Sequence, residues 1–148
     1  MANGFRVGLI EKAFVYHKRR IDFRKFAKQV YKFGIVRPIL IKWYPDNFKL
    51  TYTFPSLFLL GSLFLLVMAV VVSVWCLLPL GVIALVVFVE AVLKTGSLWI
   101  AVLAVLASFV QLYCYGFGFL KSAFYVLVLG REEKEVFKGY FFNTVKNL

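Results

Sequence analysis

The sequence predicts an α-helical integral membrane protein with about three transmembrane helices. Of its 148 residues, 62% are hydrophobic and 17% are charged, whereas a soluble domain is about 45–50% apolar and about 25% charged. Residues 50–89 form a run of 40 without a formal charge. The basic residues lie mostly ahead of that run. These observations exclude an ordinary soluble globule and a disordered tail, and the length allows a single domain.

The charge distribution predicts the orientation of the chain. The net charge is +11, and residues 1–53 carry 12 basic and 3 acidic side chains. Residues 54–130 carry only Glu90, Lys94 and Lys121. A basic segment ahead of the first span is typical of a multi-pass protein whose N-terminus is cytoplasmic. Anionic lipids are the expected partner of this charge, and nucleic acid is not, because no recognised reading module is present.

The first predicted element is a basic amphipathic helix within residues 21–53. Asp22 is expected to cap its start and Gly34 to end it. We interpret it as an interfacial helix lying in the membrane surface. A solvated basic helix packed on a soluble domain remains the alternative. Its apolar side chains share one helical face: Phe23, Phe26, Val30 and Phe33.

The uncharged run is long enough for two spans. As one helix it would extend about 60 Å, roughly twice the ~30 Å hydrocarbon core of a bilayer. Pro79 and Gly81 place the reversal at about residues 75–81. Aromatic residues that suit the headgroup region flank the spans: Trp43, Tyr44, Tyr52, Phe54, Trp75 and Trp99. The expected spans are about 55–74 and 77–93.

A third span is expected at about 97–115. Alanines recur every three residues from Ala101 to Ala107, and such a stripe allows a neighbouring helix to approach closely. The following segment, 116–130, is apolar but short and contains Lys121. It can be an interfacial helix, a continuation of the third span or a re-entrant piece, so the side of the C-terminus is left open.

Few polar residues lie within the predicted transmembrane region, 54–130. Glu90 precedes Lys94 by four residues near a helix end, so the two are expected to form an ion pair close to the interface. Cys76 and Cys114 are expected to be packing residues rather than parts of a disulfide framework or metal site. Residues 131–148 are expected to form a polar C-terminal tail.

Three blocks of the chain carry a recognisable pattern. They are Gly4-Phe5-Arg6 with Val15-Tyr16-His17-Lys18-Arg19-Arg20, then Phe26-x-x-Gln29-Val30-Tyr31-x-Phe33-Gly34-x-x-Arg37-Pro38, and last residues 108–119. These blocks resemble the bacterial family-2 glycosyltransferases, and most of all the membrane-anchored enzymes of exopolysaccharide and succinoglycan assembly. The resemblance covers essentially all of the chain, and the blocks have the same order around the apolar region.

This resemblance implies a catalytic domain of the GT-A type, an α/β fold, of which residues 1–20 are the last piece. In that family a divalent ion, Mg²⁺ or Mn²⁺, is bound by an Asp-x-Asp element and a carboxylate acts as base. This chain has only Asp22 and Asp46 as aspartates, so no catalytic residue or cofactor is assigned to it. We expect the chain alone to be inactive, because a pyrophosphate leaving group needs a cationic clamp and a positioned base.

The resemblance also implies binding residues. Gln29-Val30-Tyr31-Lys32-Phe33 is similar to the Gln-x-x-Arg-Trp motif of processive relatives, which contacts the diphosphate and the acceptor. Lys32 lacks the bidentate fork of Arg, and Phe33 is a weaker stacking platform than Trp. These departures favour transfer of single sugars. Gln29, Lys32, Phe33 and Arg37 are thus candidate acceptor-binding residues, or parts of an anchor without substrate contact.

Four residues of the first block are further candidates. Lys18, Arg19 and Arg20 are placed to contact a lipid diphosphate or merely lipid headgroups. His17 resembles a histidine that joins the metal's coordination sphere in some relatives, so it is a candidate ligand only in a full-length enzyme. A surface histidine in a basic turn is the alternative.

The function implied by the resemblance is sugar transfer from a nucleotide donor to a membrane-bound or lipid-linked acceptor, in polysaccharide biosynthesis at the bacterial inner (plasma) membrane. The chain would be the membrane-anchoring C-terminal part of that enzyme, and the nucleotide sugar would bind only with the upstream domain. The alternative is a small non-enzymatic integral membrane protein, an anchor or an assembly subunit, which hydropathy and charge fit equally well.

Overall fold

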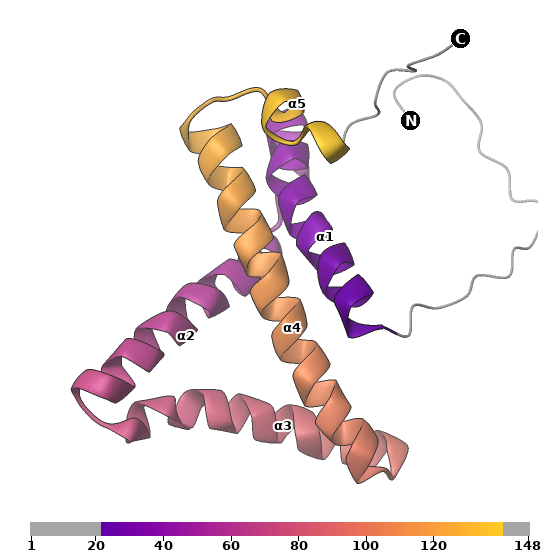
Figure 1. The fold of residues 1–148 in the computed structure, drawn as a ribbon, viewed down its shortest axis with the longest axis vertical. Helices are drawn as coiled ribbons and strands as arrows, with labels where there is room; N and C mark the ends of the chain where they lie inside the picture. Colours follow the sequence, from indigo (N-terminus) through magenta and orange to yellow (C-terminus); the bar gives the residue numbers. More distant parts are fainter. Residues whose placement is uncertain (1–21, 141–148) are drawn as a thin grey trace, which may run out of the picture.

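The computed structural model describes residues 22–140, and this part of the chain is helical without a strand (Figure 1). Its connections are short helical turns: η1 (Pro45–Asn47), η2 (Leu50–Tyr52), η3 (Val74–Leu77), the π-helical turn η4 (Phe124–Val128) and η5 (Lys138–Tyr140). The helices are α1 (Phe23–Trp43), α2 (Phe54–Val71), α3 (Leu78–Thr95), α4 (Leu98–Ala123) and α5 (Glu133–Val136).

Within residues 22–140, three segments are long and apolar enough to cross a membrane, as predicted: Phe54–Val71, Val74–Thr95 and Leu98–Val128. In Figure 1 α2, α3 and α4 outline a triangle, and α1 lies beside the half of α4 that leads to α5. The part of the structure described here therefore supports a multi-pass membrane protein by length and composition. The expected catalytic-domain remnant, residues 1–20, lies outside the described residues.

Two predicted boundaries are corrected. The reversal between the first two spans lies at 72–77, ahead of the predicted 75–81. Pro79 lies in the first turn of α3. Backbone N–H groups in a first turn have no acceptor within the helix, so proline costs no hydrogen bond there. Gly81 lies inside the helix. Of the three alternatives for 116–130, the structure shows the continuation: α4 and η4 run without a break to Val128.

Helix α1 begins where predicted and ends later. The Asp22 carboxylate accepts a hydrogen bond from the backbone N–H of Arg24 at 2.8 Å, so Asp22 is the N-cap. Gly34 does not end the helix, which continues through Pro38 to Trp43. Both residues are buried. The prediction failed because Gly34 has a packing role here, and packing against a neighbouring helix outweighs its low helix propensity.

Glycines bring α1, α2 and α4 into backbone contact. A Cβ atom at Gly34 would collide with the backbone of Tyr115 and Phe119, and one at Gly118 with the carbonyl of Tyr31. A Cβ at Gly116 would collide with the backbone of Pro55 at the start of α2. Close approach of this kind is typical of small residues between membrane helices. The contact therefore depends on glycine at these three positions.

The predicted apolar face of α1 differs from the face that packs. Val30 is 6% exposed, but Phe23 and Phe33 are 43% and 55% exposed. The residues that α1 buries are Val30, Gly34, Ile35, Pro38 and Ile39. The packing face is therefore a different one from the aromatic face, which was predicted to contact the membrane, because the glycines of α4 accommodate a stripe that begins at Val30. The aromatic face is left free for another contact.

A small core closes the end of the molecule near α5. Ile35 and Ile39 of α1 pack with Val126 of η4 and with Phe137, which follows α5. Phe137 is only 5% exposed. The described part of the predicted polar tail thus folds back onto α1 rather than extending from it.

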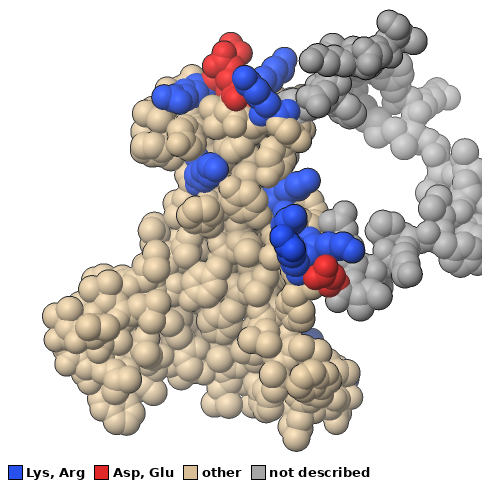
Figure 2. All heavy atoms as spheres, in the orientation of Figure 1, with Lys and Arg blue, Asp and Glu red and all other residues tan. Residues whose placement is uncertain are grey.

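The other end of the described structure is looser. Helix α3 buries none of its residues, and Ala101 on α4, a member of the predicted alanine stripe, is 0% exposed. The predicted ion pair is present, with Lys94 Nζ 2.6 Å from Glu90 Oε1. Figure 2 shows Lys and Arg gathered on the upper half, over α1 and the end of α4, while the lower half is almost uncharged in this view.

Candidate functional site

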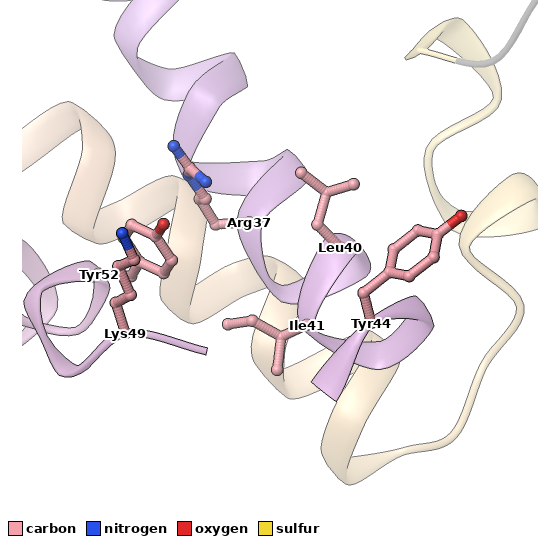
Figure 3. Close-up of a pocket in the computed structure, with 6 residues that line it drawn as sticks. All are labelled: Arg37, Leu40, Ile41, Tyr44, Lys49 and Tyr52. Atoms are coloured by element: carbon pink, nitrogen blue, oxygen red, sulfur yellow. The ribbon is translucent and has the colours of Figure 1, made fainter. Parts of the chain in front are cut away.

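A cavity of about 280 Å³ lies between the second half of α1 and the connection that leads into α2 (Figure 3). It lies at the junction between the charged and the apolar halves, because α2 begins at Phe54 directly after this connection. Its lining residues combine two cations, two phenols and two aliphatic side chains: Arg37, Leu40, Ile41, Tyr44, Lys49 and Tyr52. We call this cavity the Arg37 pocket.

Arg37 is held in place by aromatic side chains. Its guanidinium carbon lies 4.2 Å from the centroid of the Tyr52 ring, which is a cation–π contact. The Tyr115 hydroxyl of α4 interacts with the same guanidinium. Arg37 is half-buried, so these contacts fix its direction toward the pocket, as Figure 3 shows for Arg37 and Tyr52.

The positive charge of the pocket is not neutralised by a carboxylate. Within residues 22–140 the ion pairs are Lys42 with Glu133 at 3.0 Å and Lys94 with Glu90 at 2.6 Å. Neither Arg37 nor Lys49 takes part in them. The pocket therefore has the charge of an anion-binding site.

The predicted binding residues are only partly brought together. Gln29, Phe33 and Arg37 are each four residues apart, so they lie on one side of α1, away from the stripe that packs on α4. Only Arg37 lines the pocket. Lys32 lies to one side, with its Nζ 5.5 Å from the centroid of the Tyr140 ring. His17, Lys18, Arg19 and Arg20 lie outside the described residues.

Lys49 was not predicted as a site residue, and Tyr44 and Tyr52 were predicted only as members of an aromatic belt. No periodic signal marks these residues, because they follow the end of α1 in a connection built from single helical turns. The one available signal was a basic residue among aromatic residues just ahead of a span. Such a signal does not reveal which side chains meet.

A second polar cluster fastens α5 to the end of α1. Glu133 accepts hydrogen bonds from Lys42 Nζ at 3.0 Å and from the Trp43 indole Nε1 at 2.9 Å. The pKa of the Glu133 carboxyl is lowered to about 2 because its own backbone N–H donates to it, followed by Lys42 and Trp43. Its side chain is 12% exposed. This cluster, the Glu133 clip, is structural in character.

The donor atoms needed for a metal site are lacking in the described part. Residues 22–140 contain no group of three or more His, Cys, Asp or Glu side chains that could hold a metal ion. Cys76 and Cys114 are both free and half-buried.

The chain matches no family model, no curated protein and no solved structure.

Proposed function

We propose that this chain is the membrane-anchoring C-terminal part of a family-2 glycosyltransferase. The complete enzyme would transfer a sugar from a nucleotide donor to a lipid-linked acceptor at the cytoplasmic face of the bacterial inner membrane. The proposal rests on the sequence blocks quoted above and on one structural observation. That observation is the rigid attachment of the basic helix α1 to a membrane-length apolar helix, α4.

The attachment supports anchoring because it sets the position of whatever precedes α1. Gly34 and Gly118 bring the two backbones into contact, and the Glu133 clip holds the far end of α1. A catalytic domain joined ahead of Phe23 would stay close to the membrane plane. Tethering of this kind raises the effective concentration of a lipid-linked acceptor.

The outer face of α1 would meet the acceptor. Phe33 is 55% exposed and Lys32 is also exposed, so both side chains are accessible to a ligand. Gln29 precedes Phe33 by four residues and so lies on the same side of the helix, whereas Arg37 lines the pocket described above. In this proposal they bind and orient the acceptor, with Lys32 supplying a point charge to a diphosphate.

Any divalent metal would belong to the upstream domain. The described residues do not provide a donor set for one, and His17 is proposed as a ligand only when that domain is present. Mg²⁺ or Mn²⁺ bound there would neutralise the leaving diphosphate. Residues 22–140 would then contribute position and acceptor contacts, and no chemical step.

The test compares this chain with an upstream-extended reading frame, both in membranes supplied with radiolabelled nucleotide sugars and lipid extract. We expect label transfer only with the extended form. Gln29→Ala and Lys32→Ala should lower transfer about tenfold or more, the size of a lost charge-assisted contact. Lys134→Ala, an equal loss of charge on α5, should leave it unchanged.

Membrane insertion of every variant must be measured in the same preparations. Equal insertion with reduced transfer supports the acceptor role. A chain that inserts stably when no upstream frame exists, and that transfers nothing, would refute the proposal and favour the small non-enzymatic membrane protein.

A further inference from the structure

The Arg37 pocket combines a charge that attracts an anion with a position at the edge of the apolar region. Arg37 and Lys49 lack carboxylate partners among the described residues, whose ion pairs lie elsewhere. Two cations that share one cavity repel each other at close range, and an anion between them removes that repulsion. Phosphate suits this arrangement, because a guanidinium binds it with two parallel hydrogen bonds and an ammonium adds a point charge.

The remaining walls of the pocket indicate that the anion carries an apolar part. Leu40 is 36% exposed. Leu40 and Ile41 both line the cavity from α1, and Figure 3 shows Ile41 extending toward Lys49 and Tyr52. A free inorganic anion gains nothing from such a wall. A glycerol backbone with acyl chains gains by covering it.

The position of the pocket agrees with a lipid. Tyr52 lies two residues ahead of α2, and from Phe54 to Val89 the chain has no charged residue. Exposed aromatic side chains flank the pocket in the sequence, with Phe48 47% and Phe54 59% exposed. Basic pockets beside membrane helices at this level are where acidic lipid headgroups bind.

The pocket is built before any ligand arrives. The backbone N–H of Tyr52 donates to the carbonyl of Lys49 at 3.0 Å, so η2 fixes these two residues relative to each other. Thr53 Oγ1 donates to the carbonyl of Leu50 at 2.7 Å and closes the same turn. With Arg37 stacked on Tyr52, the two cations are presented without further ordering of the backbone, which lowers the entropic cost of binding.

From these observations we propose that the Arg37 pocket binds the phosphate group of an anionic glycerophospholipid, with Leu40 and Ile41 against its glycerol and upper acyl region. The bound lipid joins α1 to the connection that enters α2. It therefore stabilises the junction between the charged and the apolar halves. The inference does not depend on the glycosyltransferase proposal, because it concerns a resident lipid rather than a substrate.

The experiment uses the full chain purified in detergent, with bound lipid measured by native mass spectrometry and by the shift in melting temperature. Phosphatidylglycerol and phosphatidylcholine are added in separate titrations. We expect phosphatidylglycerol to bind and to raise the melting temperature of the wild type. The double variant Arg37→Gln, Lys49→Gln should bind it about tenfold more weakly or worse, given about 1 kcal/mol for each basic group at a lipid surface.

The double variant Arg24→Gln, Lys25→Gln is the matched control, because it removes an exposed Arg and an exposed Lys from the same helix outside the pocket. It should change phosphatidylglycerol binding less than twofold. An equal loss of phosphatidylglycerol binding in the pocket variant and in the control would overturn the proposal, since it would indicate a diffuse attraction of the basic surface to anionic lipid. The single variant Arg37→Lys keeps the charge and serves as a control for misfolding caused by loss of the Arg37 side chain. It should bind phosphatidylglycerol more tightly than Arg37→Gln.

Two competitors distinguish the sources of phosphate. Inorganic phosphate at millimolar concentration should not displace phosphatidylglycerol from the wild type; displacement would show a site for the free anion and overturn the lipid assignment. A polyprenyl phosphate should bind no more tightly than phosphatidylglycerol. Clear preference for the polyprenyl lipid would overturn the resident phospholipid and assign the pocket to an acceptor instead.

Discussion

The end of the molecule formed by α1, the second half of α4 and α5 has a core of large buried side chains, whereas the end formed by α2, α3 and the start of α4 buries only small residues such as Ser62 and Ala101. Most buried residues lie in the first part and are at most 8% exposed: Val30, Ile35, Ile39, Phe119, Val126 and Phe137. Helix α3 has none. The difference lies in composition as well as in packing, because the first part carries nearly all the charge (Figure 2).

This contrast fits a chain of which one part packs in water and the other in a lipid bilayer. In water, apolar side chains gain by burial against each other. In a bilayer, lipid is as apolar as leucine, so helices associate through close backbone packing and not through burial of large side chains. Exposed residues such as Val70, at 88%, and Leu93, at 81%, suit lipid contact.

The largest effect is expected for a large-to-small change in the small core. Ile35→Ala removes a side chain that is 1% exposed, and we expect it to lower the free energy of unfolding by about 2–5 kcal/mol. Val70→Ala is the matched change on α2, where the side chain is 88% exposed, and it should be nearly neutral. Melting in mild detergent measures both. Similar losses for the two variants would contradict the contrast between the two parts.

A smaller effect is expected when a methyl group is added between the helices. In Gly34→Ala the new Cβ would meet the backbone of Tyr115 and Phe119, so the helices must move apart at a cost of about 1–3 kcal/mol. Gly81→Ala on α3 has nothing within 4 Å of the new atom. It should be neutral or stabilising by up to about 1 kcal/mol, because Ala favours helix. If Gly34→Ala also raises the melting temperature, the close contact is absent in solution.

The Glu133 clip should respond to acid. The pKa of Glu133 is lowered from an ordinary 4.5 to about 2, so the carboxylate stabilises the folded state above pH 4.5. That contribution declines as the pH falls from about 4.5 toward about 2. Melting of the wild type and of Glu133→Gln should therefore differ at pH 7, by about 1 kcal/mol, and converge near pH 2. A difference that is independent of pH would show that charge plays no part in the clip.

The smallest effect is expected for the ion pair on α3. Glu90 and Lys94 are exposed, with side chains 59% and 72% accessible, and pairs of this kind contribute little. Lys94→Gln should leave the melting temperature within experimental error at low and at moderate salt. A measurable drop in melting temperature would mean that this end of α3 is buried against lipid or another chain, and that the pair is not exposed to water.

Much of the fold was predictable because its causes are local. The spans follow from uncharged length, and the start of α1 from an aspartate ahead of a helical pattern. The end of α1 was not predictable, because glycine often ends a helix. Gly34 instead packs on residues about 80 positions away in the chain, and no local pattern reveals that contact. The Arg37 pocket escaped prediction for the same reason: Arg37 and Tyr52 meet only because the connection folds back along α1.

The contact between α1 and α4 has a consequence for biosynthesis. Gly34 packs against Tyr115, and at about 5–20 residues per second a ribosome needs roughly 4–16 s to make the intervening 81 positions. During that interval α1 has been made but its partner has not. The glycine-containing face of α1 is therefore without its partner for that time, whereas the exposed aromatic residues Phe23 and Phe33 can contact the bilayer surface both before and after α4 is made.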